Sequence, residues 1–355
     1  MVKISTLKWR LGYYKMSYTS TNTFLKSTVL ERVFDIIGWL GYEKYPLNPN
    51  IPNQIGSYMW SGDKDFQSFV GVELQVYQDN GIITVDTRTR LGRSYWDLEL
   101  QNKTIKTLYD FFGGSFVTDE GENILFPKDE EEPTRLEAGL YIHKWKHYNS
   151  IEKLSVLNQT YEIQGEFKLS GISYIDEFNP NIVLNNLQIP FLVGAWEEYL
   201  KSTFVVLTKC SSEKDRERIF KKLLSKAKVQ PDNVESFSQN SESVEWLLTE
   251  FIPFQRPQSI VENFKIIDER IDINGVFMKP TPNQTQSLFD RIDNVVIIRN
   301  NIVHHGRIYD IVTDDVIKQF IEDFNEAVDR TYRCLNDYYK LDYRQDEYYF
   351  KHEDK

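Results

Sequence analysis

The spacing of hydrophobic residues changes character along the chain. In the first third, helical spacing over 23–40 gives way to alternation over 69–77, where every second residue is apolar. The Asp-Asn-Gly sequence at 79–81 is typical of a tight hairpin turn, so residues 82–90 are expected to form the return strand. These elements predict an α+β fold in which helices accompany an antiparallel meander.

Two further elements are expected before a linker. Residues 95–101 alternate again, which predicts a third strand, and Asn102 is suited to cap a short helix that a Gly-Gly pair ends. The acidic run at 127–135 holds two prolines and almost no apolar residue, which is typical of an exposed loop. The residues that follow, 134–180, show a helical pattern only in part.

From about residue 190 onward the apolar spacing is helical. Residues 191–207 are apolar almost all round, as expected of the central helix in a bundle. A long helix is expected over 281–305 with Gly306 at its end, and a final helix after Thr313. Shorter helices are expected between these over 216–227, 243–251 and 258–267.

The pattern as a whole predicts two domains. Residues 1–130 are expected to form the α+β domain, and 131–184 a linker and connecting segment. Residues 185–345 are expected to form an all-α helical bundle, followed by a polar tail at 346–355.

Composition narrows the function classes. The net charge of -11 argues against a surface coated with phosphate-binding cations, although a small basic cleft on an acidic body still suits a nucleic-acid substrate. Cys210 and Cys334 lie far apart without metal-ligand spacing, which is typical of intracellular thiols. No stretch reaches about 18 consecutive apolar residues, and residues 1–14 lack the pattern of a secretory signal. We therefore expect a cytoplasmic protein with no membrane partner.

Sequence motifs of phosphate-binding loops and nucleophile elbows are missing from the chain. His143 and His147 are four residues apart and would share a helix face, as a zinc pair would. No glutamate follows His143 in the H-E-x-x-H manner, so we favour surface histidines on a basic patch over a metal site. Neither a metal nor another cofactor is expected.

Arg88, Arg90 and Arg93 alternate along the return strand and the turn after it, beside Tyr95 and Trp96. Such a face suits RNA, because arginines bind phosphates and aromatic rings stack on bases. We favour a solvated strand face opposite the core over such an RNA-binding face.

The long helix over 281–305 ends in the sequence RNNIVHH. Four of its polar residues bear on function: Arg299, Asn300, His304 and His305. A helix end with cations near its last carbonyl groups is one interpretation. Asn300 and His304 lie one helical turn apart, however, which indicates a polar site. Arg299 and His304 are five positions apart, about 140 degrees around a regular helix. They would share a site if the helix end loosens or if a second copy of the helix completes it.

The string Arg299-Asn300-x-x-x-His304 resembles the R-x4-6-H motif of the HEPN superfamily in its R-N-x-x-x-H form. The context is similar as well, because GAWEEYL lies about 100 residues upstream, and a glycine turn and a helix opening Thr-Asp-Asp-Val follow the motif. The segments GAWEEYL and FQRPQSIVENFK look like the RiboL-PSP-HEPN type over roughly 185–340. The first 130 residues resemble no family. The resemblance implies a HEPN-like helical bundle.

The resemblance further implies a metal-independent endoribonuclease, often part of an anti-phage defence or toxin system. RNA carries its own nucleophile, the 2′-hydroxyl, so no catalytic Ser or Cys is needed. In this scheme His304 moves a proton, Arg299 stabilises the extra negative charge of the transition state, and Asn300 orients His304 or binds a phosphate oxygen. His305 is a weaker candidate because it points about 100 degrees further round the helix. Glu197 would hold Arg299 in place or simply lie at the edge of the bundle.

The products of this chemistry would be a 2′,3′-cyclic phosphate and a 5′-hydroxyl. The expected partners are an RNA substrate, a second copy of the chain that completes the active site, and an antitoxin or an activating protein. The first domain would sense a trigger or position the RNA. Two alternatives stay open: a catalytically inactive dimeric HEPN-type module that binds nucleotides or RNA or acts as a scaffold, and an unrelated helical interaction protein.

Overall fold

The computed structural model of the protein describes residues 17–25, 27–62, 66–90, 92–127, 132–162, 169–227, 243–282 and 284–341. The polar tail expected at 346–355 lies outside these ranges. The chain divides into two compact units between Arg135 and Leu136.

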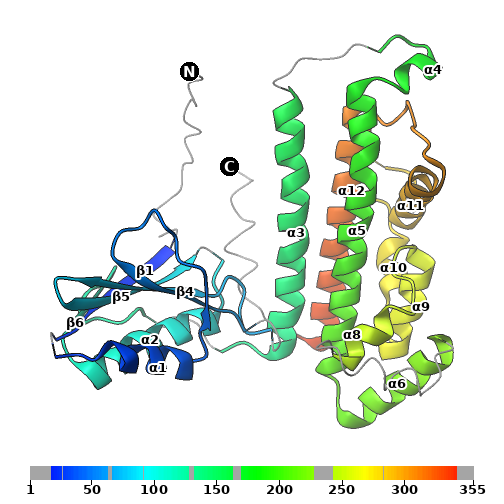
Figure 1. Ribbon diagram of the computed structural model, residues 1–355. Helices are drawn as coiled ribbons and strands as arrows, with labels where there is room; N and C mark the ends of the chain where they lie inside the picture. Colours follow the sequence, from blue (N-terminus) through cyan, green and yellow to red (C-terminus); the bar gives the residue numbers. More distant parts are fainter. Residues whose placement is uncertain are drawn as a thin grey trace. The chain divides into compact units, whose positions relative to one another are not determined.

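The first unit contains an antiparallel sheet with two helices packed against it (Figure 1). The strand order in the described residues is β2-β3-β4-β5-β1-β6-β7. The strands are β1 (Ser17–Thr23), β2 (Glu43–Lys44), β3 (Gln54–Trp60), β4 (Val72–Asp79), β5 (Ile82–Arg90), β6 (Ser115–Thr118) and β7 (Gly121–Glu122). The helices are α1 (Leu30–Trp39) and α2 (Tyr95–Phe112). The expected α+β fold with an antiparallel meander is confirmed.

Alternation of side chains explains the two layers of this unit. Leu74 and Val76 of β4 are fully buried and pack with Val33 and Ile37 of α1. Burying each such side chain contributes about 1.5–3 kcal/mol, which is enough to set which face of the sheet the helices cover.

The third strand expected over 95–101 is wrong, because these residues begin helix α2. The hydroxyl of Ser94 accepts a hydrogen bond from the backbone N–H of Asp97, and the Asp97 carboxylate accepts one from the backbone N–H of Ser94. Trp96, Leu100 and Leu108 are buried at helical spacing, and the shorter window also fits a period of two. Asn102 therefore lies inside the helix, where its side chain bonds the backbone of Phe126, and does not cap it.

The helix expected over 23–40 is shorter than predicted. Residue Thr23 still belongs to β1, which pairs with β5 from Ser17↔Arg90 to Thr23↔Thr84, and α1 begins only at Leu30. Strand pairing with distant residues outweighs the local helical spacing here.

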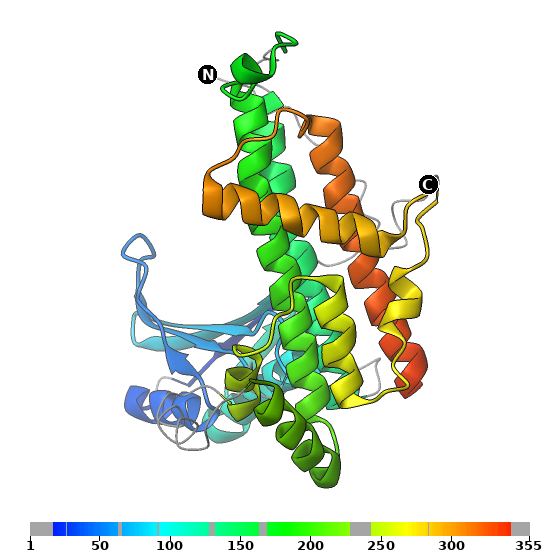
Figure 2. The ribbon, with the colours of Figure 1, turned by 90° about the vertical axis from the view of Figure 1, so that its right-hand side faces the viewer.

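The regular elements of the second unit are helices in the described residues, as expected for 185–345. Its helices are α3 (Arg135–Glu162), α4 (Ser173–Asp176), α5 (Pro180–Lys209), α6 (Glu213–Ala227), α8 (Val244–Thr249), α9 (Pro257–Ile267), α10 (Ile273–Phe277), α11 (Leu288–His305) and α12 (Asp314–Tyr339). α3, α5 and α12 run side by side, and α11 lies across α5 (Figures 1 and 2). Fully buried aromatic residues such as Trp196 and Phe324 contact each other in its core.

Residues 131–184, expected to be a linker and connecting segment, hold α3 and α4. The apolar pattern of α3 is weak because polar side chains lie on its packed face. The Nζ of Lys144 lies 3.1 Å from an Asp329 carboxylate oxygen of α12. The ring of His147 is buried, with Nδ1 3.4 Å from the Ala195 carbonyl oxygen and Nε2 3.3 Å from Oδ1 of Asn325. The expectation of two surface histidines is therefore wrong for His147.

The long helix expected over 281–305 begins seven residues later, at Leu288. The Ser287 hydroxyl caps it by accepting a hydrogen bond from the backbone N–H of Asp290. The preceding loop is held by the Arg330 guanidinium of α12, which donates to the carbonyl groups of Val276, Lys279 and Pro280. The end at Gly306 and the start of α12 after Thr313 are as predicted.

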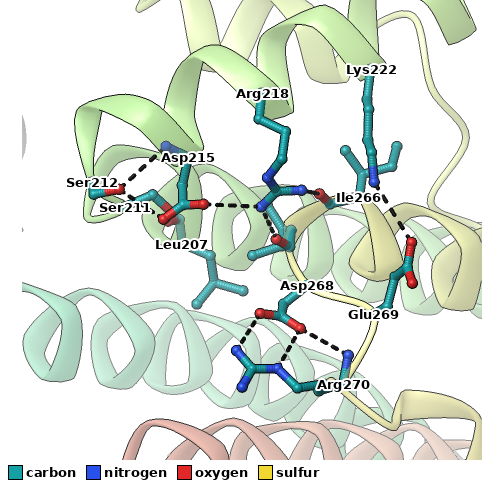
Figure 3. Close-up of polar contacts among 11 residues, drawn as sticks. Leu207, Ser211, Ser212, Asp215, Arg218, Lys222, Ile266, Asp268, Glu269 and Arg270 are labelled. Carbon is teal, nitrogen blue, oxygen red and sulfur yellow. Dashed lines mark hydrogen bonds and ion pairs between the residues drawn. The ribbon is translucent and has the colours of Figure 1, made fainter.

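A cluster of polar contacts joins α6 to the end of α9 (Figure 3). The Arg218 guanidinium donates to the last carbonyl groups of α9, those of Ile266 (2.9 Å) and Ile267 (2.6 Å). These carbonyls have no partner inside the helix, so the arginine caps the negative end of the helix dipole. Asp215 accepts from Arg218 at 3.5 Å and keeps the guanidinium in place.

Candidate active site at the end of α11

The last turns of α11 present polar side chains on a helix whose other face packs the bundle. Val296 is fully buried and Ile302 is nearly so. Arg299 and Asn300 are half-buried, and His304 is exposed in the final turn. One helix thus supplies both the packing and the candidate chemistry, and it crosses α5 (Figure 2).

The structure brings Arg299 and Asn300 together. Nη1 of Arg299 donates to Oδ1 of Asn300 at 3.0 Å, and Nε of Arg299 is buried without a hydrogen-bond partner in the described part of the chain. Asn300 therefore orients the guanidinium. The roles expected from the sequence, orienting His304 or binding a phosphate oxygen, stay predictions. The guanidinium keeps further donors for an anion, because the bond to Asn300 uses only one of its N–H groups.

His304 and His305 are exposed at the helix end. Within the described residues, no hydrogen bond or ion pair joins His304 to Arg299 in one chain. Gly306 follows in the left-handed region with φ of +63°, and its N–H bonds the Ile302 carbonyl at 3.0 Å. The glycine closes the helix in the manner of a C-terminal cap, so the two histidines lie beside the last, negatively polarised carbonyl groups.

Asparagines of α5 fasten the segment that follows the motif, and the sequence-based prediction missed them. Asn186, which is fully buried, accepts from the backbone N–H of Tyr309 and donates to its carbonyl oxygen, both at 2.9 Å. Asn185 donates to the Val312 carbonyl oxygen at 3.2 Å and to the Asp314 carboxylate at 2.7 Å. The sequence signal was a pair of adjacent amides between the apolar residues Leu184 and Leu187.

Glu197 does not contact Arg299. Its carboxylate accepts from Nε2 of Gln255 at 2.8 Å and lies 3.5 Å from Nζ of Lys201. The proposed support of Arg299 by Glu197 is therefore wrong for this structure, because the glutamate is directed toward the residues that precede α9.

The three arginines of the first unit do not form one open cationic face. Arg90 is ion-paired with Glu73, and the guanidinium of Arg93 lies 3.6 Å from the centre of the Tyr18 ring. Trp96 is buried, and its indole N–H donates to Glu132, so it offers no stacking surface for a base. Arg88 remains exposed on β5.

Among the described residues, no group of three His, Cys, Asp or Glu side chains is arranged to hold a metal ion. No described helix is long and apolar enough to span a membrane.

Burial, together with Lys146 and Lys209, lowers the pKa of His143 to about 3. Burial likewise lowers the pKa of His147 to about 4.

Comparison with known proteins bears on the second unit. The family model described as RiboL-PSP-HEPN matches residues 151–337, which are 187 of the 355 residues. The match starts within α3, earlier than the resemblance at 185–340 predicted, and no family matches the first unit. No curated protein and no solved structure matches the chain significantly.

Proposed function

Because the chain belongs to the RiboL-PSP-HEPN family, we propose that its helical unit is an endoribonuclease acting through Arg299 and His304. The family suggests a role in RNA cleavage or nucleotide binding. One observation carries the more specific proposal: a half-buried guanidinium, oriented by Asn300, precedes an exposed histidine at the capped end of the same helix.

The proposed reaction is an attack of the RNA 2′-hydroxyl on the adjacent phosphorus. The 2′-oxygen gives up its proton to a base and forms a new bond to phosphorus, while the bond from phosphorus to the 5′-oxygen breaks. The leaving 5′-oxygen takes a proton from an acid, which yields a 2′,3′-cyclic phosphate and a 5′-hydroxyl. His304 would serve as base or acid, and Arg299 would bind the phosphate oxygens as negative charge builds on them.

A second copy of the chain would complete this site. In-line displacement needs a base and an acid on opposite sides of phosphorus, and His304 from each of two copies would supply both. Apolar side chains beside the motif suit such a contact: on α5 Leu187 is 59% and Phe191 44% exposed, and on α11 Ile297 is 46% and Val303 48% exposed. A symmetric dimer would bury this patch against the same patch of the second copy.

The test is cleavage of single-stranded RNA by the purified full chain with EDTA present. We expect cleavage that survives chelation and falls by at least about 100-fold in Arg299→Ala and in His304→Ala. His305→Ala is the matched control, a neighbouring histidine that is also exposed and whose loss should change the rate little. RNA binding without cleavage by the wild type would instead favour the inactive nucleotide-binding or scaffold module. Cleavage that persists in His304→Ala would refute the assignment.

The wider role that we propose is anti-phage defence or toxin activity, with an antitoxin or activating partner. The first unit, over residues 1–135, would then sense the trigger or position RNA, and Arg88 is an exposed cation on its strand β5. Expression of the wild type should slow cell growth, whereas expression of His304→Ala should not. Equal growth with both proteins would argue against a toxin, and Arg88→Ala should weaken RNA binding if the first unit takes part.

A further inference from the structure

The turn that carries His304 is fastened to α5 by a chain of hydrogen bonds. We propose that Asn186 and Tyr309 are positioning residues that fix the orientation of His304. This inference rests on the proposed function of His304, but the hydrogen bonds themselves are independent of it.

This series of hydrogen bonds starts at the carboxamide of Asn186, whose side chain is fully buried. Its Nδ2 donates to the Ile182 carbonyl oxygen at 2.8 Å within α5 and to the Tyr309 carbonyl oxygen at 2.9 Å. Its Oδ1 accepts from the Tyr309 backbone N–H at 2.9 Å. A buried amide that bonds both polar groups of one distant residue holds that residue in a single register, because losing either bond would leave a buried group unpaired.

Tyr309 is in turn hydrogen-bonded to α11, the helix that carries His304. Its hydroxyl oxygen accepts from Nδ2 of Asn301 at 2.8 Å, and the two residues are eight positions apart across the Gly306 turn. The N–H of Arg307 also reaches the Asn301 carbonyl oxygen at 3.4 Å. Asn301 is thus held on the backbone side by the helix cap and on the side-chain side by Tyr309.

His304 depends on these bonds because little packing holds its turn. Val303, His304 and His305 are all exposed, and Ile302 is the last buried residue of α11. Helix ends loosen readily, since their last carbonyl groups lack partners within the helix. The bonds from Asn186 through Tyr309 to Asn301 therefore decide where the last turn, and with it the imidazole, lies. Arg299 lies one turn earlier on a better packed stretch and needs no such support.

The test compares Tyr309→Phe and Asn186→Ala with Tyr199→Phe in the full chain. Tyr309→Phe removes only the hydroxyl that accepts from Asn301. Tyr199→Phe is the matched control, because it removes a tyrosine hydroxyl that bonds the Val328 carbonyl oxygen elsewhere in the bundle. Two signals are read: the imidazole C–H resonance of His304 in protein labelled at histidine, assigned with His304→Ala, and the kcat and KM for RNA cleavage.

We expect the His304 resonance to shift or broaden in Tyr309→Phe and Asn186→Ala and to stay unchanged in Tyr199→Phe. Cleavage by Tyr309→Phe should lose about tenfold in kcat at unchanged KM, because the proton-transferring group is misplaced while Arg299 still binds phosphate. An unmoved resonance in Tyr309→Phe would overturn the inference, as would a moved resonance with an unchanged kcat. A wild type that cuts no RNA, with the resonance moved in Tyr309→Phe, would overturn the ribonuclease proposal and leave the positioning of His304 supported.

Discussion

The buried imidazole of His147 should make the helical unit sensitive to acid, and the structure sets the size of the effect. Burial lowers the pKa of this side chain from 6.5 to about 4, while the Ala195 carbonyl, Asn325 and the charge of Asp329 act in the opposite direction. The neutral ring is the form that the folded state accommodates. The unfolded chain binds a proton below pH 6.5, whereas the folded chain binds it only near pH 4.

The sign of the effect follows from these two values. Between pH 4 and 6.5 the unfolded state carries more protons, so the free energy of unfolding rises with pH across this window and is lost as the pH falls. A difference of about 2.5 pKa units corresponds to about 3 kcal/mol. This stabilisation is fully present above pH 6.5 and nearly gone at pH 4.

Urea denaturation of the full chain at several pH values, followed by far-UV circular dichroism, measures this slope. His147→Gln removes the titrating group and keeps a polar neutral side chain, so its stability should depend less on pH over the same window. His305→Gln, at an exposed histidine, is the control and should match the wild type. Equal slopes for His147→Gln and the wild type would refute the reasoning.

Three further predictions concern the bundle. Arg291 and Asp323 form a buried ion pair at 2.7 Å, so Arg291→Met should cost about 3–5 kcal/mol in urea denaturation, and adding Asp323→Leu should recover much of it. If the double variant were no more stable than the single one, the burial argument would fail. Gly306→Ala meets no atom within 4 Å but must adopt φ of +63°, so it should cost about 1 kcal/mol by the same measurement. Leu187→Glu with Ile297→Glu should shift sedimentation toward the monomer, and an unchanged sedimentation coefficient would place the dimer contact elsewhere.

Predictions from the sequence were right where the spacing of nearby residues fitted only one kind of secondary structure. The alternation of β4 and β5, the glycine end of α11 and the stripe of α12 each follow from spacing over a few turns or pleats. The resemblance to the HEPN superfamily is confirmed as a family membership, because the family model matches residues 151–337, a range that includes α11. The role of Arg299, Asn300 and His304 stays a prediction.

The errors arose where two patterns overlapped or where polar residues lay inside the core. Residues 95–101 fit a period of two as well as a helix, and the bonds between Ser94 and Asp97 decided in favour of the helix. The apolar spacing of α3 was weak because Lys144 and His147 face the bundle. Lys144 forms an ion pair with Asp329 there, and His147 a hydrogen bond with Asn325. Burial of a polar residue depends on a distant partner that spacing does not reveal.

The chain alone was enough to predict an α+β part, a helical part and a helix that ends in Arg299, Asn300 and His304. Tertiary structure decided what surrounds that helix end. It paired Arg299 with Asn300, directed Glu197 to Gln255, and brought Asn186 to Tyr309 across 123 positions of sequence. Contacts between such distant residues depend on how whole helices pack, and that packing cannot be predicted from the spacing of neighbouring residues.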